Sequence, residues 1–143
     1  MAKPKTQEQL DRAADLRLQK TYNRDLAWYN AQLEEQEGGC GVCGRSEGTR
    51  RLHVDHDHSW KKVRIETMKT GGAWVAKALY LGNLYLEGSE KKATAVRKIK
   101  RLLLKDSVRG LLCYSCNAGL QKFADSPKRF RAAADYLEAH QGV

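Results

Sequence analysis

The four cysteines of the chain form two C-x-x-C pairs, Cys40/Cys43 and Cys113/Cys116. Each pair lies among small or polar residues, in the stretches Cys-Gly-Val-Cys-Gly and Cys-Tyr-Ser-Cys-Asn, which allow a sharp turn. Zinc takes four thiolate ligands in a tetrahedron, and two such turns supply them. The sequence therefore predicts one structural zinc ion bound by all four cysteines.

The cysteine pattern also leaves disulfides, buried thiols and a redox C-x-x-C pair as alternatives. No apolar secretion signal follows Met1, which disfavours disulfides, and nothing thioredoxin-like surrounds either pair. A gap of 69 residues separates Cys43 from Cys113, which is long for a zinc ribbon. The metal is therefore expected to join distant parts of the fold and to contribute to folding.

A second group of reactive side chains lies between the two pairs, in the run His53-Val54-Asp55-His56-Asp57-His58. The run holds three of the four histidines of the chain. So many ionisable side chains do not suit an ordinary buried strand, because several charges would be left unpaired. A second zinc site, an exposed polar turn and an accidental histidine-rich tract are the competing interpretations.

Phosphodiester hydrolysis fits this run better than those alternatives. The reaction needs a base to activate water and a hard cation to carry negative charge. We expect Asp55 to bind Mg²⁺ or Mn²⁺ and a neutral His56 to accept the proton of the water. On a strand these two side chains diverge while His56 and His58 share a face, so a distortion at the strand end is expected to bring ligand and base together.

Asn117 is the expected second ligand of the catalytic cation. It directly follows Cys116, so a bound zinc ion would fix its position. It also lies near the expected start of a helix, where free N–H groups favour phosphate. A plain helix N-cap is the alternative role for this asparagine.

The elements that must position these residues follow from hydrophobic spacing and from turn residues. Helices are expected over 6–36, 90–105 with Ser89 as N-cap, 118–124, and 127–140 with Ser126 as N-cap. Strands are expected over 51–55 and 108–112, with 62–68 as a further candidate and 73–86 ambiguous between helix and strand. Breaks are expected at Gly38-Gly39, Gly71-Gly72 and Gly88-Ser89. Together these predict an α+β fold.

Composition limits the class of protein. The chain has 143 residues and a formal net charge of +9, with 41% hydrophobic residues, enough for a modest core. No stretch approaches the ~20 apolar residues of a membrane span. We therefore expect neither a membrane protein nor a secreted one, and we expect a cytoplasmic location. The charge favours a polyanionic partner, with nucleic acid first.

The excess charge is concentrated in residues 59–107, which hold twelve basic and four acidic residues, net +8. A solvated outer face is the alternative reading of this charge. Within the segment we expect Trp74 and Tyr80 to pack in an apolar run. The expected DNA-backbone contacts are Lys61, Lys62, Arg64, Lys98, Lys100, Arg101 and Lys105.

Taken in order, these motifs resemble the recombination endonuclease VII family of phages, which belongs to the HNH or His-Me finger nucleases. The resemblance rests on residues 36–44, on the run 53–58, and on Val-Arg-Gly-Leu-Leu-Cys-Tyr-Ser-Cys-Asn-Ala-Gly-Leu over 108–120. It covers roughly residues 20–58 and 108–140. In relatives a short loop bridges the two parts, whereas residues 59–107 intervene here.

The resemblance implies a zinc-stapled ββα-metal core flanked by a long N-terminal helix and a C-terminal helix. It implies that Asp55 and Asn117 bind Mg²⁺ or Mn²⁺, that His56 is the general base and that His58 contacts the scissile phosphate. Some relatives place an acid where Leu120 stands, so the metal site is leaner here. Residues 1–36 are expected to form a helical arm with a role in homodimerisation, and residues 37–143 the nuclease domain with its basic insert.

The expected function is a metal-dependent endonuclease acting on double-stranded or branched DNA, with junction resolution as the first expectation. One alternative is a sequence-preferring HNH nicking enzyme, such as a homing or packaging nuclease. The other is a zinc-stapled DNA-binding protein without catalysis. A binding module has no need of a base next to a metal ligand, which favours the nuclease. The expected setting is the cytoplasm of a phage host.

Overall fold

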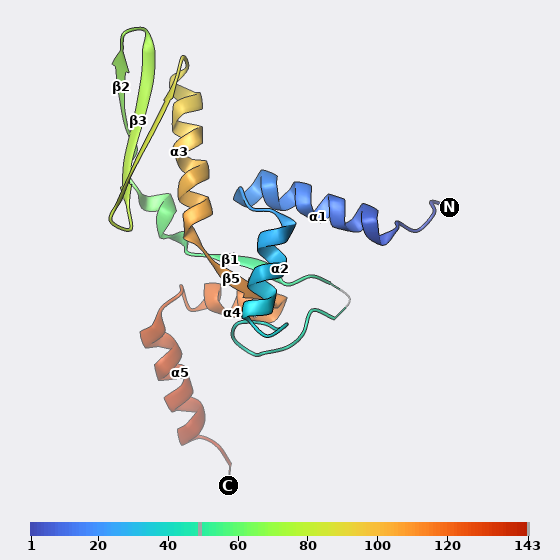
Figure 1. Cartoon of the computed structure of the whole chain (residues 1–143). Coiled ribbons are helices and arrows are strands. Elements are labelled where there is room, and N and C mark those ends of the chain that lie inside the picture. Colours follow the sequence, from blue (N-terminus) through green and yellow to red (C-terminus); the bar gives the residue numbers. More distant parts are fainter. Residues whose placement is uncertain (49, 143) are drawn as a thin grey trace.

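The computed structural model describes residues 1–48 and 50–142, which form five α-helices, one 3₁₀ helix and two small antiparallel sheets. This mixed architecture confirms the α+β prediction. A two-stranded sheet lies at the centre, a three-stranded sheet with one helix projects from it, and the last helix projects on another side (Figure 1). Within the described residues, no helix is long and apolar enough to cross a membrane.

The central sheet pairs β1 (His53–His56) with β5 (Val108–Leu112) in antiparallel register. Asp55 lies opposite Gly110, and the register shifts between Asp55 and His56. A shift of this kind is a β-bulge, which turns the following side chain away from its regular direction. The expected distortion at the end of the strand is therefore present. The predicted strand 51–55 begins two residues later than expected, while 108–112 is confirmed at both ends.

The prediction of one helix over residues 6–36 is wrong. The segment forms α1 (Gln7–Tyr22) and α2 (Leu26–Glu35), separated by Asn23 in the left-handed conformation at φ 53°. Asn23 ends the first helix because asparagine adopts this conformation at little cost. Asp25 then caps the second helix by accepting a hydrogen bond from the Trp28 N–H.

Both N-terminal helices belong to the same hydrophobic core as the central sheet. Leu18 of α1 and Tyr29 of α2 are buried against residues of β1, β5 and the adjoining loops, the other buried members being Cys40, Leu52, Val54, Leu111 and Leu112. The Tyr29 hydroxyl donates to Glu47 and accepts from the Leu52 N–H, which fixes the entrance to β1.

Gln36, at the end of α2, fastens this helix to β5. Its side-chain oxygen accepts from the Leu111 N–H at 2.9 Å, and its side-chain nitrogen donates to the carbonyls of Leu111 and Gly39 at 2.8 and 2.9 Å. A side-chain amide thus pairs with β5 as a neighbouring strand would. Gly110 leaves room for it, since a Cβ there would lie 2.9 Å from the Gln36 oxygen.

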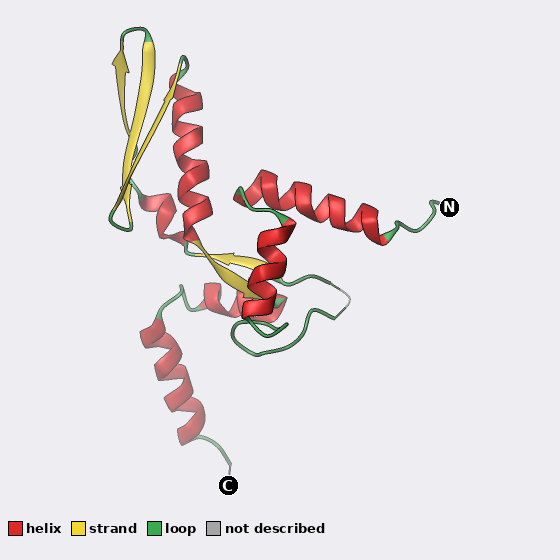
Figure 2. Ribbon diagram, in the orientation of Figure 1, coloured by secondary structure: helices red, strands yellow, loops and turns green. Residues whose placement is uncertain are grey.

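Residues 66–107 form a β-β-β-α unit. The strands β2 (Glu66–Thr70), β3 (Ala73–Tyr80) and β4 (Asn83–Ser89) make the three-stranded sheet, and α3 (Lys92–Ser107) packs along it (Figure 2). Each hairpin has a two-residue turn with positive φ at both positions, Gly71-Gly72 and Leu81-Gly82. The ambiguity over residues 73–86 thus resolves to two strands.

The boundaries of this unit correct three predictions. Residues 58–62 form a 3₁₀ helix, η1 (His58–Lys62), so the candidate strand 62–68 starts only at Glu66. The break expected at Gly88-Ser89 is absent, because these two residues are the last two of β4. Helix α3 begins at Lys92, and Lys91 takes the N-cap position expected for Ser89 without making a side-chain bond.

The β-β-β-α unit has its own core, separate from that of the central sheet. Its buried residues are Ala76, Ala78, Tyr80, Ala95, Ile99 and Leu103, with Trp74 packed against them. The expectation that Trp74 and Tyr80 pack inside the insert is therefore confirmed. The two ends of the unit meet at the central sheet, where the Asp57 N–H donates to the Ser107 carbonyl at 2.8 Å.

The C-terminal part holds α4 (Tyr114–Lys122) and α5 (Pro127–Ala139). The sharp turn expected for Cys-Tyr-Ser-Cys-Asn is instead the N-cap and first turn of α4, so this helix starts before the predicted residue 118. Cys113 is its N-cap and accepts from the Cys116 N–H. The prediction for α5 is confirmed, with Ser126 as N-cap and Pro127 in the first turn.

The role of Gln36 gives a test of this fold. We expect Gln36→Ala to lower the free energy of unfolding by ~1–3 kcal/mol, because the buried Leu111 N–H loses its acceptor. The exposed Asn30 on the same helix provides a matched control, and Asn30→Ala is expected to change stability by less than ~0.5 kcal/mol. Denaturant unfolding measures both, and equal losses in the two variants would contradict the role of Gln36.

Candidate active site and cysteine cluster

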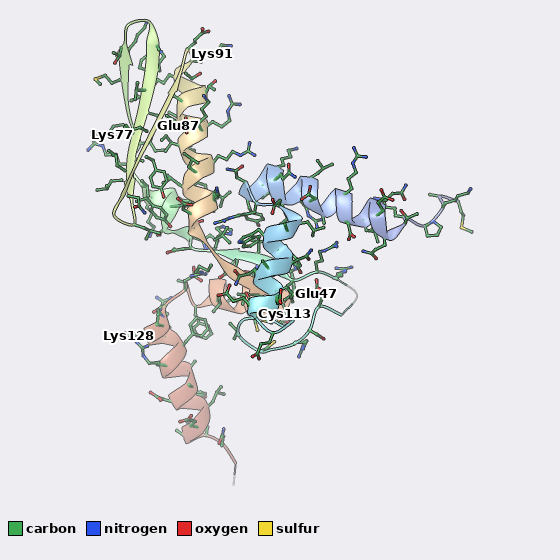
Figure 3. The ribbon with its side chains drawn as sticks, in the orientation of Figure 1. Glu47, Lys77, Glu87, Lys91, Cys113 and Lys128 are labelled. Carbon is green, nitrogen blue, oxygen red and sulfur yellow. The ribbon has the colours of Figure 1, made fainter. Side chains whose placement is uncertain are left out.

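The four cysteine sulfurs lie together although their pairs are far apart in the sequence. All four Sγ atoms lie within 4.8 Å of one another, and Cys43 and Cys113 approach to 3.8 Å. A zinc ion with bonds of about 2.3 Å sets the edge of its sulfur tetrahedron at about 3.8 Å. The cluster could therefore hold zinc, and Cys113 marks it below α2 in Figure 3.

Backbone hydrogen bonds shape the first half of the cluster. The Cys40 N–H donates to the Arg45 carbonyl at 2.8 Å, and the Gly44 N–H donates to the Cys40 carbonyl at 2.9 Å. Gly39 makes this turn possible, because a Cβ there would lie 2.4 Å from the Gly44 carbonyl oxygen. Helix α4 shapes the second half, since Cys113 caps it and Cys116 lies in its first turn.

The thiols of the cluster differ in acidity. Burial acts to raise the pKa of Cys40, but hydrogen bonds from the backbone N–H groups of Cys43, Cys113 and Val42 lower it to about 6. Burial and hydrogen bonds to the other three thiols raise the pKa of Cys116 to about 12. Thiolates this close repel one another, so full ionisation of the cluster requires a cation between them.

Asp55 is a buried carboxylate with a cationic partner. Its side chain is 8% exposed and accepts two hydrogen bonds from Arg109, from Nε at 2.7 Å and from Nη2 at 3.0 Å. Both residues lie on the central sheet, and Arg109 is next to Gly110, the register partner of Asp55. This bidentate pair gives the buried carboxylate a cationic hydrogen-bond partner.

The two histidines after Asp55 lie against each other, as their shared face predicts. The ring centroids of His56 and His58 are 4.5 Å apart. Burial lowers the pKa of His56, and the positive charge of His58 adds to this; Asp55 opposes it, while Lys61 and Arg109 add smaller effects of the same sign. The lowered pKa favours the neutral form of His56 near neutral pH.

Asp125 connects His58 to the Arg109 pair. Its Oδ2 lies 3.3 Å from His58 Nδ1, and its Oδ1 accepts from Arg109 Nη2 at 3.4 Å. Asp125 follows α4 in the left-handed conformation at φ 54°, and its N–H donates to the Leu120 carbonyl. A continuous series of contacts thus links Asp55, Arg109, Asp125 and His58.

Asn117 lies in the first turn of α4, where its N–H donates to the Cys113 carbonyl at 2.9 Å. The same helix start contacts β1, because the ring of Tyr114 lies 5.8 Å from that of His53. Asn117 is therefore on the element that begins beside the strand of Asp55. It is not the N-cap itself, since Cys113 has that position.

Sequence reasoning missed Arg109, Asp125 and Tyr22, whose ring lies 6.0 Å from that of His56. Arg109 had a usable signal, because alternation on a strand that pairs with β1 places one of its side chains toward Asp55. Asp125 and Tyr22 had none, since each meets the histidines only through tertiary packing, Asp125 after the end of α4 and Tyr22 at the last residue of α1.

The basic side chains expected to contact DNA lie along η1, in the connection that follows it, and along α3. Lys61, Lys62, Arg64 and Lys100 are exposed. Arg101 is also exposed, but its guanidinium donates to the Gln19 carbonyl at the end of α1. The ammonium group of Lys98 donates to the Gly88 carbonyl, while Lys105 is half-buried. Two of the seven side chains thus also join elements of the fold.

The cysteine cluster gives a test of metal-supported folding. We expect Cys113→Ser to lower the unfolding midpoint by roughly 10 °C or more, because a zinc site of this kind contributes strongly to folding. We also expect the zinc content of the purified protein to fall from one ion per chain. Val42→Ser, at an exposed position in the first turn, is the control. An unchanged midpoint in Cys113→Ser, with no zinc in the wild type, would contradict the role of the cluster.

Comparison with known proteins adds one result to this geometry. The model of the family described as recombination endonuclease VII matches residues 15–139. No curated protein and no solved structure matches the chain. The matched range spans nearly the whole chain, including the second half of α1, all of α2, the β-β-β-α unit, the cysteine cluster and the histidines of the run 53–58. The chain belongs to the recombination endonuclease VII family, a family of nucleases.

Proposed function

We propose that the protein is a divalent-cation-dependent endonuclease that hydrolyses phosphodiester bonds of branched DNA. In this proposal β1, β5 and α4 form the ββα-metal core of a His-Me finger nuclease. One observation carries it: a buried carboxylate, Asp55, is followed across a β-bulge by His56, a histidine whose lowered pKa leaves it neutral. Membership of a nuclease family supports the same reading.

The oxygen donors of the site suit Mg²⁺ or Mn²⁺. Asp55 offers a carboxylate and Asn117 an amide oxygen, which are the ligand types of hard cations. A cation bound there would supply positive charge to the phosphate and to the leaving oxygen. Each carboxylate oxygen of Asp55 accepts one hydrogen bond from Arg109 and keeps a second lone pair that could bind a cation, and Asp125 contacts the same guanidinium.

The two histidines have separate roles in this mechanism. His56 accepts the proton of the attacking water, because it is neutral and its ring is half-buried next to Asp55. His58 contacts the scissile phosphate. Its Nδ1 faces Asp125, so the carboxylate orients the ring and leaves Nε2 for the phosphate. Arg109 holds both carboxylates in place from the opposite strand.

We further propose that the nuclease domain spans residues 37–143 and that the insert binds the DNA backbone. The exposed lysines of η1 come directly after the catalytic run, so phosphates near the cut lie within their reach. The N-terminal helices are proposed to support a homodimer. Leu10 and Leu16 of α1 are 43% and 56% exposed and offer apolar surface for that contact.

The catalytic assignment predicts which substitutions abolish cleavage. We expect Asp55→Asn and His56→Ala to slow cleavage by ~10²-fold or more, since each removes a group used in the reaction. Both should keep DNA affinity close to wild type, and thermal unfolding checks that each variant is folded. His140→Ala changes a histidine at the end of α5 and is the control.

Nicking of supercoiled plasmid, with and without Mg²⁺, measures this effect. Full activity without Mg²⁺ or Mn²⁺ would contradict the cation dependence. Wild-type rates in His56→Ala would contradict the assignment of the base. DNA binding without any cleavage by the wild type would instead favour a binding module.

The insert predicts the salt dependence of DNA binding. Each phosphate that a cation neutralises contributes ~0.9 to the slope of log K against log salt on duplex DNA. Changing Lys61, Lys62 and Lys100 to Gln is therefore expected to make the slope shallower by up to ~2.7. The matched control changes Lys3, Lys5 and Arg12 to Gln. If both triple variants keep the wild-type slope, the insert does not lie along the DNA.

A further inference from the structure

A cavity of about 510 Å³ lies on the side of β1 that faces the N-terminal helices. Helices α1 and α2 form one wall, and the segment 50–54 that leads into β1 forms the other. The volume lies within the roughly 300–1,000 Å³ typical of small-molecule sites. The lining residues are Ala14, Arg17, Leu18, Thr21, Tyr22, Tyr29, Arg50, Arg51, Leu52, His53 and Val54.

The lining combines an apolar floor with cations. Leu18, Tyr29, Leu52 and Val54 are buried members of the central core, so the floor is apolar. The lining also holds three arginines and no carboxylate. Arg51 pairs with Asp11, outside the lining.

Arg17 and Arg50 differ from Arg51 in that they make no ion pair within residues 1–48 and 50–142, and both are exposed. Two uncompensated guanidinium groups attract an anion, and phosphate oxygens suit their geometry. The apolar floor in turn suits a flat ring. A nucleotide has both parts.

Tyr22 joins this cavity to the catalytic residues. Its ring lines the cavity and lies 6.0 Å from that of His56. Burial raises the pKa of Tyr22; the charge of Arg17 opposes this and that of Asp55 adds to it. Tyr22 thus belongs to the lining of the cavity and also lies near the histidine of the site. When the scissile phosphate of a DNA strand lies at His56 and His58, the neighbouring nucleotide of that strand lies beside this cavity.

We propose that the cavity binds one unpaired nucleotide of the substrate strand, next to the bond that is cut. The base lies on the apolar floor against Tyr22, and its phosphate contacts Arg17 and Arg50. Bases can stack on aromatic side chains without sequence preference. This proposal rests on the proposed nuclease function and deepens it, because bulges, flaps and forks hold unpaired nucleotides that a continuous duplex lacks.

The test compares binding to two matched DNAs in buffer without added Mg²⁺ or Mn²⁺, so that cleavage does not enter. One is a continuous duplex, and the other carries a single unpaired 2-aminopurine nucleotide. We expect the wild type to prefer the second DNA and to change the fluorescence of the 2-aminopurine on binding. Changing Arg17 and Arg50 to Ala should reduce that preference at least about tenfold, as loss of charged hydrogen bonds predicts.

Three further variants sharpen the experiment. Changing Arg12 and Arg45 to Ala removes the same charge from exposed positions outside the cavity and should leave the preference unchanged. Changing Arg17 and Arg50 to Lys should restore part of it, because the charge returns. Tyr22→Leu should abolish the fluorescence change while duplex binding persists. Unfolding midpoints show that each variant is folded.

The outcomes separate this inference from the nuclease proposal. If the Arg17/Arg50 and Arg12/Arg45 variants lose the preference equally, the preference depends only on net charge. That result would overturn the cavity assignment. A wild type with no preference for the unpaired nucleotide would also overturn it, even if the protein cleaves DNA. A retained preference in a protein that never cleaves would leave the cavity assigned and remove the nuclease function.

Discussion

The contact between the two cysteine pairs is the constraint on which the candidate active site depends. Cys40 and Cys43 follow α2, whereas Cys113 and Cys116 start α4, and their sulfurs gather within 4.8 Å. This contact brings α4 back to the strand that carries Asp55 and His56. With only a four-residue strand pairing with a five-residue one, the central sheet is too small to hold these elements by itself. Gln36 adds a second tie, from α2 to the buried Leu111 of β5.

The charged side chains around Asp55 are arranged so that opposite charges pair with one another. Two carboxylates, Asp55 and Asp125, share the guanidinium of Arg109, and Asp125 also faces His58. Burying Asp55 without Arg109 would be costly, because an unpaired carboxylate loses its hydration. In the same arrangement, Asp125 is a second carboxylate partner of the Arg109 guanidinium. Asp55 and His58 are thus connected through two side chains, Arg109 and Asp125.

Local signals in the sequence predicted some of these features and not others. Strand 108–112, the helix after Ser126 and the gathering of four cysteines follow from spacing and capping residues, and all three are confirmed. The helix break at Asn23 was not predicted, because apolar residues keep helical spacing across it. The Leu81-Gly82 turn was not predicted, because leucine is rare at such turn positions. Leu81 nevertheless has φ 50° here. Asp125 joins the site only through tertiary contacts that no local pattern encodes.

Helix α3 runs into β5 without a connecting loop, since Ser107 ends one and Val108 starts the other. An α-helix turns by about 100° and advances 1.5 Å for each residue. The length of α3 therefore affects the angle between the β-β-β-α unit and the central sheet. Adding one residue to the helix would swing its sheet to another side of the molecule, whereas adding a residue at a hairpin tip would leave that angle alone. Among homologues, insertions and deletions in this unit should therefore occur mostly at the hairpin tips. Those within α3 should add or remove whole helical turns.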